Sequence, residues 1–325
     1  MSNDAMIQRL QPLLDLLDNG LALYRRHFFS FVMLSALAIV PLALMITLIF
    51  ISISRSWWSA SEGSALLFLF AVIFALFLLA IYMVGWLSRA AAAALDDRPL
   101  QLREVLMLRP GRATLMGCFS VVYLFVVQLL SSLVSVFVIC PIYLLLGMII
   151  IAVSDNNPTS SLTTFLGMVM ILVFILLYGF GFLISNAIYS SLIYALQPWI
   201  HETRPFGELI QRSLDLVAYR FWRNLFVWIL AGMLVAALGI TVLFTVGILL
   251  SLPLSFVLDT SSITYTAISV CMWLLGFIVI IPPLPIWMTL LYRKNCQSRE
   301  GNDLEKMLVE WWYEHFEVKP STNTL

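Results

Sequence analysis

The chain has 325 residues, of which 62% are apolar and only 11% are charged, and its acidic and basic residues balance to a net charge of zero. A soluble domain carries about 25% charged residues, so this composition excludes an ordinary water-exposed surface and indicates that lipid solvates much of the chain. The zero balance removes any bulk electrostatic argument for nucleic-acid binding. The four cysteines show no CxxC or Cys/His pattern, so neither a disulfide framework nor a metal site is expected.

Six apolar runs are long enough to cross a bilayer, whose ~30 Å hydrocarbon core requires roughly 20 apolar residues of helix. A backbone in lipid must satisfy its own hydrogen bonds, and the runs are continuous and not alternating, so we expect helices and not a β-barrel. They form one polytopic domain over residues 1–291, and a cytoplasmic tail over 292–325 follows it. The predicted spans are residues 28–53, 65–88, 113–140, 163–196, 225–256 and 264–290.

The third and fourth runs are longer than one span requires, which leaves an eight-span arrangement open. A proline at Pro141 could kink the third run, and Gly179 and Gly181 could break the fourth. Six spans are favoured, because eight would create a cytoplasmic loop at residues 154–161 that contains no basic residue.

The basic residues predict the orientation of the chain. All but one of the 18 Lys and Arg residues lie before the first span, after the last, or in the loops that follow spans two and four. Arg55 is the exception. The positive-inside rule therefore predicts that both termini are cytoplasmic.

Amphipathic helices are predicted on the cytoplasmic side. Between residues 205 and 221, apolar positions recur at helical spacing, and charged and amide residues occupy the opposite face. Residues 7–24 show the same pattern, and 98–109 show a shorter form of it. The chain therefore has three weak repeats, each an interfacial helix followed by a two-span hairpin, and a further amphipathic helix is expected at about 303–316.

Two short motifs carry a family resemblance. The first is Glu202, then Arg212-Ser213, then Phe221-Trp222-Arg223, and the second is Tyr292 with Arg293-Lys294 and the later sequence REGNDLE at 299–305. Together they resemble bacterial membrane domains of the glycerophosphoryl diester phosphodiesterase type and their stand-alone relatives. The Asp-Leu-Arg that is common in that family after the tyrosine is replaced here by Arg293-Lys294-Asn295.

The resemblance implies a six-helix integral membrane protein of the bacterial cytoplasmic (inner) membrane. It does not imply phosphodiesterase activity, because the catalytic barrel of those enzymes is a separate soluble domain for which this chain has no room.

Seven residues are candidates for binding contacts. Gln128 and Asn186 lie within predicted spans, where they could join helices by hydrogen bonds of ~1 kcal/mol or less, or contact a substrate. The others lie at the cytoplasmic interface, where they could contact lipid headgroups or a partner, although topology and helix-dipole effects also explain them. These interfacial candidates are Glu202, Arg212, Ser213, Arg220 and Arg223.

No catalytic residue, metal site or cofactor is predicted, because the chain has no nucleotide-binding loop and no nucleophile with a plausible base. The sequence predicts a non-enzymatic integral membrane protein that organises lipids or partner proteins. Its expected partners are membrane lipids and other membrane proteins. The alternative is a transporter or channel for an uncharged or amphiphilic solute, which the repeats favour and the absence of charge in the span cores opposes.

Overall fold

A computed structural model describes residues 3–54, 62–98, 105–106, 110–154, 161–259 and 262–316. Within these ranges the regular structure is helical throughout, and no strand is present. Most of the predicted 98–109 interfacial helix lies outside the described residues. The elements are α1 (Asn3–Arg26), α2 (Phe28–Ser54), α3 (Glu62–Leu95), α5 (Pro110–Ser154), α6 (Ser161–Ala195), α7 (Gln197–His201), α8 (Phe206–Ala218), α9 (Phe221–Phe244), the π-helix η2 (Thr245–Leu250), α10 (Ser251–Val257), α11 (Ile263–Ile280) and α12 (Pro283–Phe316).

The chain is an all-α polytopic membrane protein with six helical stretches in the described residues that are long and apolar enough to span a bilayer. The predicted spans coincide with α2, α3, α5, α6, the α9–η2–α10 stretch, and α11 with the start of α12. The backbone stays helical through Pro141, Gly179 and Gly181, so the breaks that an eight-span arrangement needs are not present.

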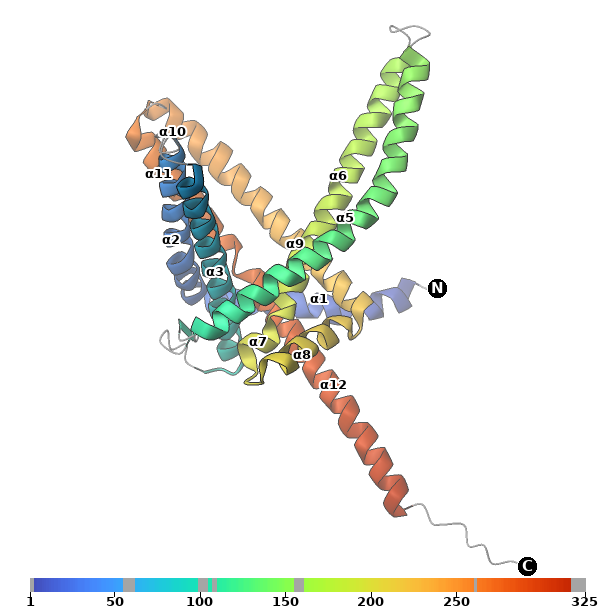
Figure 1. Cartoon of the computed structure of the whole chain (residues 1–325). Coiled ribbons are helices and arrows are strands. Elements are labelled where there is room, and N and C mark those ends of the chain that lie inside the picture. The colour runs from blue at the N-terminus through green and yellow to red at the C-terminus, as the bar shows by residue number, and fades with distance from the viewer. Residues whose placement is uncertain are drawn as a thin grey trace, which may run out of the picture.

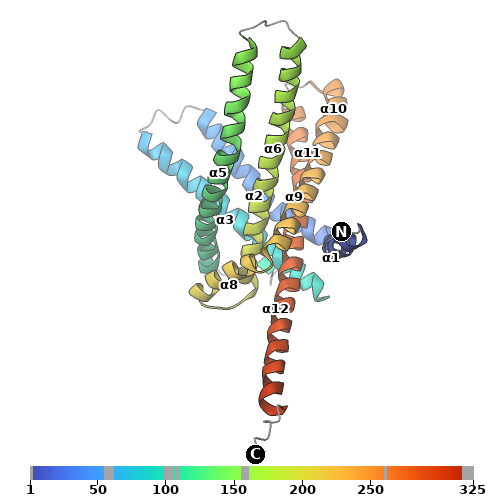
Figure 2. The ribbon, with the colours of Figure 1, turned by 90° about the vertical axis from the view of Figure 1, so that its right-hand side faces the viewer.

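The six spanning elements form three hairpins in a cyclic order (Figures 1 and 2). The second helix of each hairpin contacts the first helix of the next: α3 contacts α5, α6 contacts α9, and α11 closes the cycle on α2. Two amphipathic helices, α1 and α8, lead into the first and third hairpins. Three repeated hairpins arranged around a common axis would produce this cyclic order of contacts.

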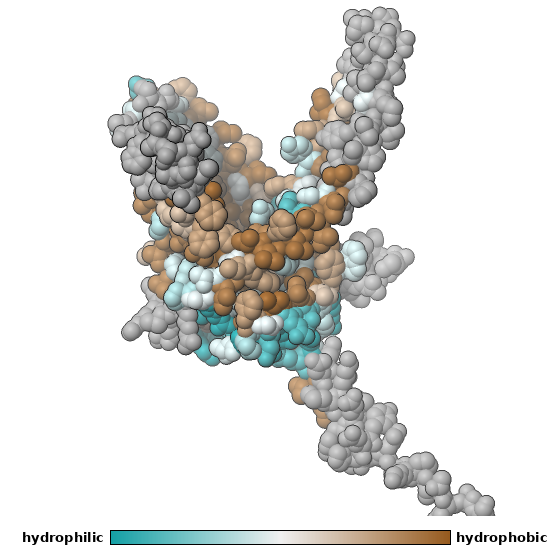
Figure 3. Space-filling view, viewed as in Figure 1, coloured by the Kyte–Doolittle hydropathy of each residue, from teal (hydrophilic) through white to brown (hydrophobic). Residues whose placement is uncertain are grey.

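The hairpins converge at one end of the molecule and diverge at the other. Figure 1 shows the α5/α6 hairpin leaning away from α2, α3, α10 and α11, and Figure 2 shows the α2/α3 pair separating from α10 and α11. Charged and polar residues gather at the convergent end, below a broad apolar surface (Figure 3). We call the diverging parts of the hairpins the arms.

Helix α1 docks on α12 and is not simply laid on a membrane surface. Leu13, Leu16 and Leu17 are buried against Trp287 and its neighbours, and the Trp287 indole nitrogen donates a 2.9 Å hydrogen bond to the Leu17 carbonyl. The approach is close at Gly20, where a Cβ atom would lie 2.3 Å from Trp287 Cδ1. A glycine at this position is therefore required by the contact between the two helices.

Helix α12 continues without interruption from Pro283 to Phe316. The predicted boundary at 291/292 between a membrane domain and a tail therefore has no counterpart in the backbone. Residues 281–282 do separate α11 from α12, as expected for a stretch with three prolines within four residues. The amphipathic helix expected at 303–316 forms the distal part of α12.

Helix α8 has two apolar surfaces. Leu209, Ser213 and Leu216 are buried in the protein, whereas Phe206 and Leu214 are half-exposed on another face. The helix begins at Phe206, and Pro205 is its N-cap residue. Arg220 then adopts a left-handed conformation with φ 49°, which turns the chain sharply into α9.

Candidate functional site

The convergent end contains a connected set of polar side chains, which we call the polar layer. Its central element is the first part of α12, which contacts α1, α3, α6, α7 and α9. The members that carry its hydrogen bonds are Ser88, Tyr194, Gln197, His201, Glu202, Arg212, Arg223, Asn224, Thr289, Tyr292, Arg293 and Asn295.

Glu202 is the first centre of this layer. Its Oε1 accepts a 2.8 Å hydrogen bond from the Tyr292 hydroxyl and lies 3.4 Å from Arg212 Nε, while its Oε2 forms a 2.6 Å ion pair with Arg204 Nε. The side chains of Glu202 and Arg212 are only 16% and 15% exposed. One carboxylate therefore joins the end of α7 to α8 and α12, and it is screened from water enough for the pair to matter energetically.

Asn295 is the second centre and is fully buried. Its amide nitrogen donates to the Tyr194 hydroxyl at 2.8 Å and to Asn224 Oδ1 at 3.0 Å, and its oxygen accepts from Arg223 Nη2 at 2.5 Å. Asn224 in turn donates to the Tyr219 carbonyl at the α8–α9 turn. Because each amide group has a partner, the buried network stabilises a single arrangement of α6, α9 and α12.

Gln197 is the third centre, at the start of α7. Its amide nitrogen donates to Ser88 Oγ at 3.1 Å, and its oxygen lies 3.1 Å from Thr289 Oγ1 and 3.2 Å from His201 Nε2. The His201 ring also stacks on Tyr292, with centroids 5.7 Å apart. The two residues whose chemistry might have suggested acid–base work, His201 and Glu202, are thus both held by structural partners.

A bidentate ion pair fixes α12 to the end of α3. Arg293 donates from Nη1 to Asp96 Oδ1 at 2.6 Å and from Nη2 to Asp96 Oδ2 at 3.1 Å. The hydrogen bonds from Arg293 hold the pKa of the Asp96 carboxyl below its usual range. Asp97, directly after it, has φ 50° and ends α3 with an Arg98 N–H to Ala93 carbonyl bond of 3.0 Å, as a left-handed helix cap does.

The interfacial candidates fall into two groups. Glu202, Arg212 and Arg223 are members of the polar layer, and Ser213 is buried with its hydroxyl accepting from the Trp199 indole nitrogen at 3.1 Å. Arg220 is exposed and lies over the Tyr219 ring. Of the three arginines considered for headgroup binding, only Arg220 therefore extends to the surface.

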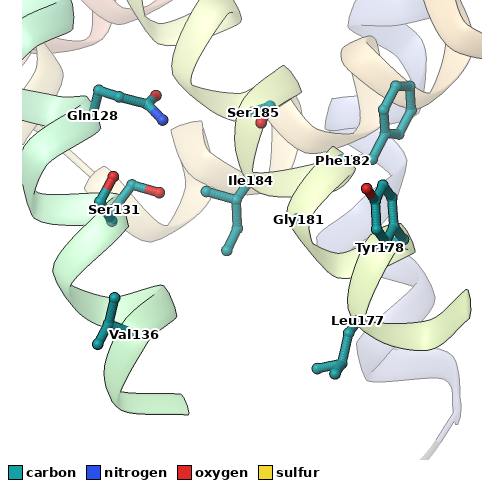
Figure 4. Close-up of a pocket in the computed structure, with 10 residues that line it drawn as sticks. Gln128, Ser131, Val136, Leu177, Tyr178, Gly181, Phe182, Ile184 and Ser185 are labelled. Carbon is teal, nitrogen blue, oxygen red and sulfur yellow. The ribbon is translucent and has the colours of Figure 1, made fainter. Parts of the chain in front are cut away.

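The two intramembrane candidates also differ. Asn186 packs against α9, where a Cβ atom on Gly232 would lie 2.6 Å from Asn186 Cβ, and its amide nitrogen donates to the Phe182 carbonyl of its own helix. Gln128 instead lines a pocket of about 660 Å³ between α5 and α6 (Figure 4). The pocket is also lined by Ser131, Ser132, Val136, Leu177, Tyr178, Gly181, Phe182, Ile184 and Ser185.

Several residues of the polar layer were not candidates in the sequence, notably Gln197, Thr289, Tyr292 and Asn295. They share only that each is a polar or hydroxyl-bearing residue at or near a span end. That signal does not identify the partners, which lie 71 to 109 positions away in the chain.

No family model, curated protein or solved structure matches this chain. Among the residues that the structure describes, no group of three or more His, Cys, Asp or Glu side chains is placed to hold a metal ion. Among the described residues, the candidate site comprises the hydrogen-bonded polar layer and a pocket with polar lining between two spanning helices.

Proposed function

We propose that the chain is a non-enzymatic integral membrane protein that organises lipids or partner proteins in the bacterial cytoplasmic membrane, with its polar layer and both termini on the cytoplasmic side. The observation that carries this proposal is the contrast between a tightly connected polar layer and arms that leave long apolar faces uncovered. In the most apolar window of the Gly167–His201 span, no residue is buried.

The lengths of the helices support a role in which the arms contact other molecules. Helices α5 and α6 have 45 and 35 residues. At about 1.5 Å per residue, both exceed the length that a straight crossing of a ~30 Å core requires. Large side chains such as Leu172 and Leu176 are about 60% exposed along α6, and a surface of this kind must be covered by acyl chains or by the helices of a partner.

The engagement of His201, Glu202 and Arg212 with protein partners also favours a structural role for the polar layer. A carboxylate that accepts from Tyr292 and pairs with two arginines is fixed in position. The polar layer would fix the six spans relative to one another at the convergent end. The arms could then change their separation to fit the lipids or partner helices between them.

Native mass spectrometry after release from lipid nanodiscs tests this proposal. The expected result is a monomer that retains lipids, or a complex with a second protein. The Arg220→Gln variant tests whether the exposed arginine binds anionic headgroups. A protein that is released bare, with neither lipid nor subunit, would contradict the proposed role.

Transport of an uncharged or amphiphilic solute remains the second candidate, because one specific observation favours it. The α5/α6 pocket places uncharged hydrogen-bonding groups inside a spanning hairpin. A flux assay in proteoliposomes with a neutral amphiphile would support transport if uptake depended on the protein, and a rate equal to that of empty liposomes would exclude it for that solute.

A further inference from the structure

The α5/α6 pocket lies next to a direct hydrogen bond between the two helices. On the side nearest the polar layer, the Tyr123 hydroxyl of α5 donates to Ser191 Oγ of α6 at 3.0 Å, and both residues are buried. Gln128 lies five residues further along α5, and Ser185 lies six residues earlier in α6. Figure 4 shows Gln128 and Ser131 on one helix facing Ser185 and Ile184 on the other.

The polar groups of the pocket differ from many of those elsewhere in the spans. The hydroxyls of Thr47, Ser120 and Thr241 bond to the carbonyls four residues earlier in their own helices, whereas the buried hydroxyls of Ser35 and Ser190 have no partner. Spanning-helix amides outside the pocket are also satisfied, including Asn186 and Gln197. Within the described ranges, by contrast, no hydrogen bond reaches the side chains of Gln128, Ser131, Ser132 or Ser185.

A partner-free amide in a spanning hairpin is costly. The Gln128 side chain has two N–H donors and a carbonyl acceptor, and hydrocarbon offers a partner to none of them. Gln128 is exposed on the surface of the hairpin and would therefore face lipid at membrane depth, where an amide without a hydrogen bond costs roughly 1–3 kcal/mol. The pocket therefore favours an occupant that supplies both hydrogen-bond donors and acceptors.

The lining also restricts the charge and shape of that occupant. The ten lining residues include no acidic or basic side chain, so an ionised headgroup would enter without a counter-charge, which is expensive at membrane depth. Val136, Leu177, Ile184 and Phe182 provide an apolar wall beside the polar groups. A volume of about 660 Å³ lies within the usual range for small-ligand sites.

We infer that the pocket between α5 and α6 binds a neutral amphiphile whose headgroup carries hydroxyl or ester groups, in the chemical class of a diacylglycerol. Gln128 and the three serines bind the headgroup, and the apolar wall contacts the adjoining part of an acyl chain. The inference does not rest on the organising role proposed above. It is necessary but not sufficient for the transport alternative, since a bound lipid need not cross the membrane.

Photolabelling in nanodiscs tests the site directly. The full-length protein is placed in phosphatidylcholine nanodiscs that contain a photoactivatable diacylglycerol, and the cross-linked peptides are mapped by mass spectrometry. We expect labels on the peptides that contain residues 128–136 and 177–185, and we expect unlabelled diacylglycerol to compete. Phosphatidic acid with the same acyl chains should compete poorly, because it adds only the phosphate charge.

Variants sharpen the test. Gln128→Leu combined with Ser132→Ala should reduce labelling by about tenfold, since each lost hydrogen bond contributes roughly 0.5–1.5 kcal/mol. Thr241→Val is the matched control, because it removes a hydroxyl that faces lipid on α9 and already bonds to its own helix. Neither change opens a cavity or removes a contact in the polar layer, and an unchanged thermal transition verifies that both variants are folded.

Three outcomes would overturn the inference. Labelling of the double variant at the wild-type level would show that the polar lining does not select the ligand. If phosphatidic acid competed as well as diacylglycerol, the site would not discriminate between neutral and anionic headgroups. Cross-links between two copies of the chain through this pocket would make a second copy its occupant. A failed flux assay with intact photolabelling would exclude transport of the tested solute and leave the inferred binding site unaffected.

Discussion

The polar layer and the arms are built from the same apolar chain but satisfy their polar groups in opposite ways. In the polar layer, a carboxylate, three amides and several hydroxyls bond to one another across four or more helices. In the arms, hydroxyls such as those of Thr241 and Thr245 bond to their own helix, and Gln128 and three serines line one pocket. Groups that bond across helices fix the relative positions of those helices, whereas groups that bond within a helix leave it free to separate from its neighbours.

This comparison predicts that the convergent end of the molecule carries the stability of the fold. The largest effect is expected at Trp287, which is fully buried and joins α1 to α12. Trp287→Ala should lower the free energy of unfolding by about 3–5 kcal/mol, as tryptophan truncations in cores do. Thermal unfolding in detergent followed by size-exclusion chromatography measures it. Phe29→Ala is the control, because Phe29 is 83% exposed on α2, and an equal loss in both variants would contradict the comparison.

The next effect is expected at Asn295. Asn295→Leu keeps a similar volume but leaves Arg223 Nη2 and Asn224 Oδ1 without their partner. Leaving buried polar groups unsatisfied should cost about 1–3 kcal/mol. The same unfolding assay measures it, with exposed Gln211→Leu on α8 as the control. A stabilised Asn295→Leu protein would show that the network is dispensable.

A smaller effect is expected at Glu202. Glu202→Gln keeps the shape but removes the charge that pairs with Arg204 and Arg212. Since these groups are not fully buried, the loss should be about 1–2 kcal/mol, below that for a fully buried pair. Glu208→Gln, which changes an exposed acid on α8, should leave the free energy of unfolding unchanged.

A double-mutant cycle that combines Glu202→Gln with Tyr292→Phe should give a coupling energy. Strict additivity of the two changes would mean that the 2.8 Å hydrogen bond contributes little.

The smallest effect is expected from pH at the Asp96–Arg293 pair. Because Arg293 lowers the pKa of folded Asp96, the folded state binds that proton less readily than the unfolded state does. The pair therefore contributes stability above the unfolded pKa of about 3.9, and this contribution is lost as the pH falls through the folded pKa.

At neutral pH the contribution should be below about 1 kcal/mol, because the pair is partly exposed to solvent. Comparing wild type with Asp96→Asn between pH 7 and pH 3 tests it: the difference in melting temperature should shrink in acid. A difference that is constant over this range would mean that the ion pair contributes no pH-dependent stability.

The sequence predicted the spans well for a physical reason. Hydrocarbon thickness sets the length of each apolar run, and a backbone in lipid can only be helical, so residues 28–53 and 225–256 could be placed without any knowledge of their neighbours. The three-hairpin order followed from the repeated alternation of amphipathic and apolar segments. These features depend on local composition alone.

The polar layer could not be predicted in the same way. A polar segment after the last span was interpreted as a cytoplasmic tail, because polarity usually means solvent exposure, yet Tyr292 and Asn295 are buried. Their burial depends on Glu202, Tyr194 and Asn224, and no periodicity specifies which polar residues will satisfy one another. The contact between Leu17 and Trp287 spans 270 positions and is likewise invisible to local patterns.

The separation of the arms is the feature on which the proposed role depends, and a distance measurement in lipid tests it most directly. Spin labels at Leu172 on α6 and Leu249 in η2 would report the separation of two arms, and both side chains are well exposed. Pulsed electron paramagnetic resonance in nanodiscs should give a long, broad distance distribution that narrows when a ligand or partner binds. A short, narrow distribution, consistent with helix axes about 8–10 Å apart, would show closed arms with no surface left for lipids or partners to occupy.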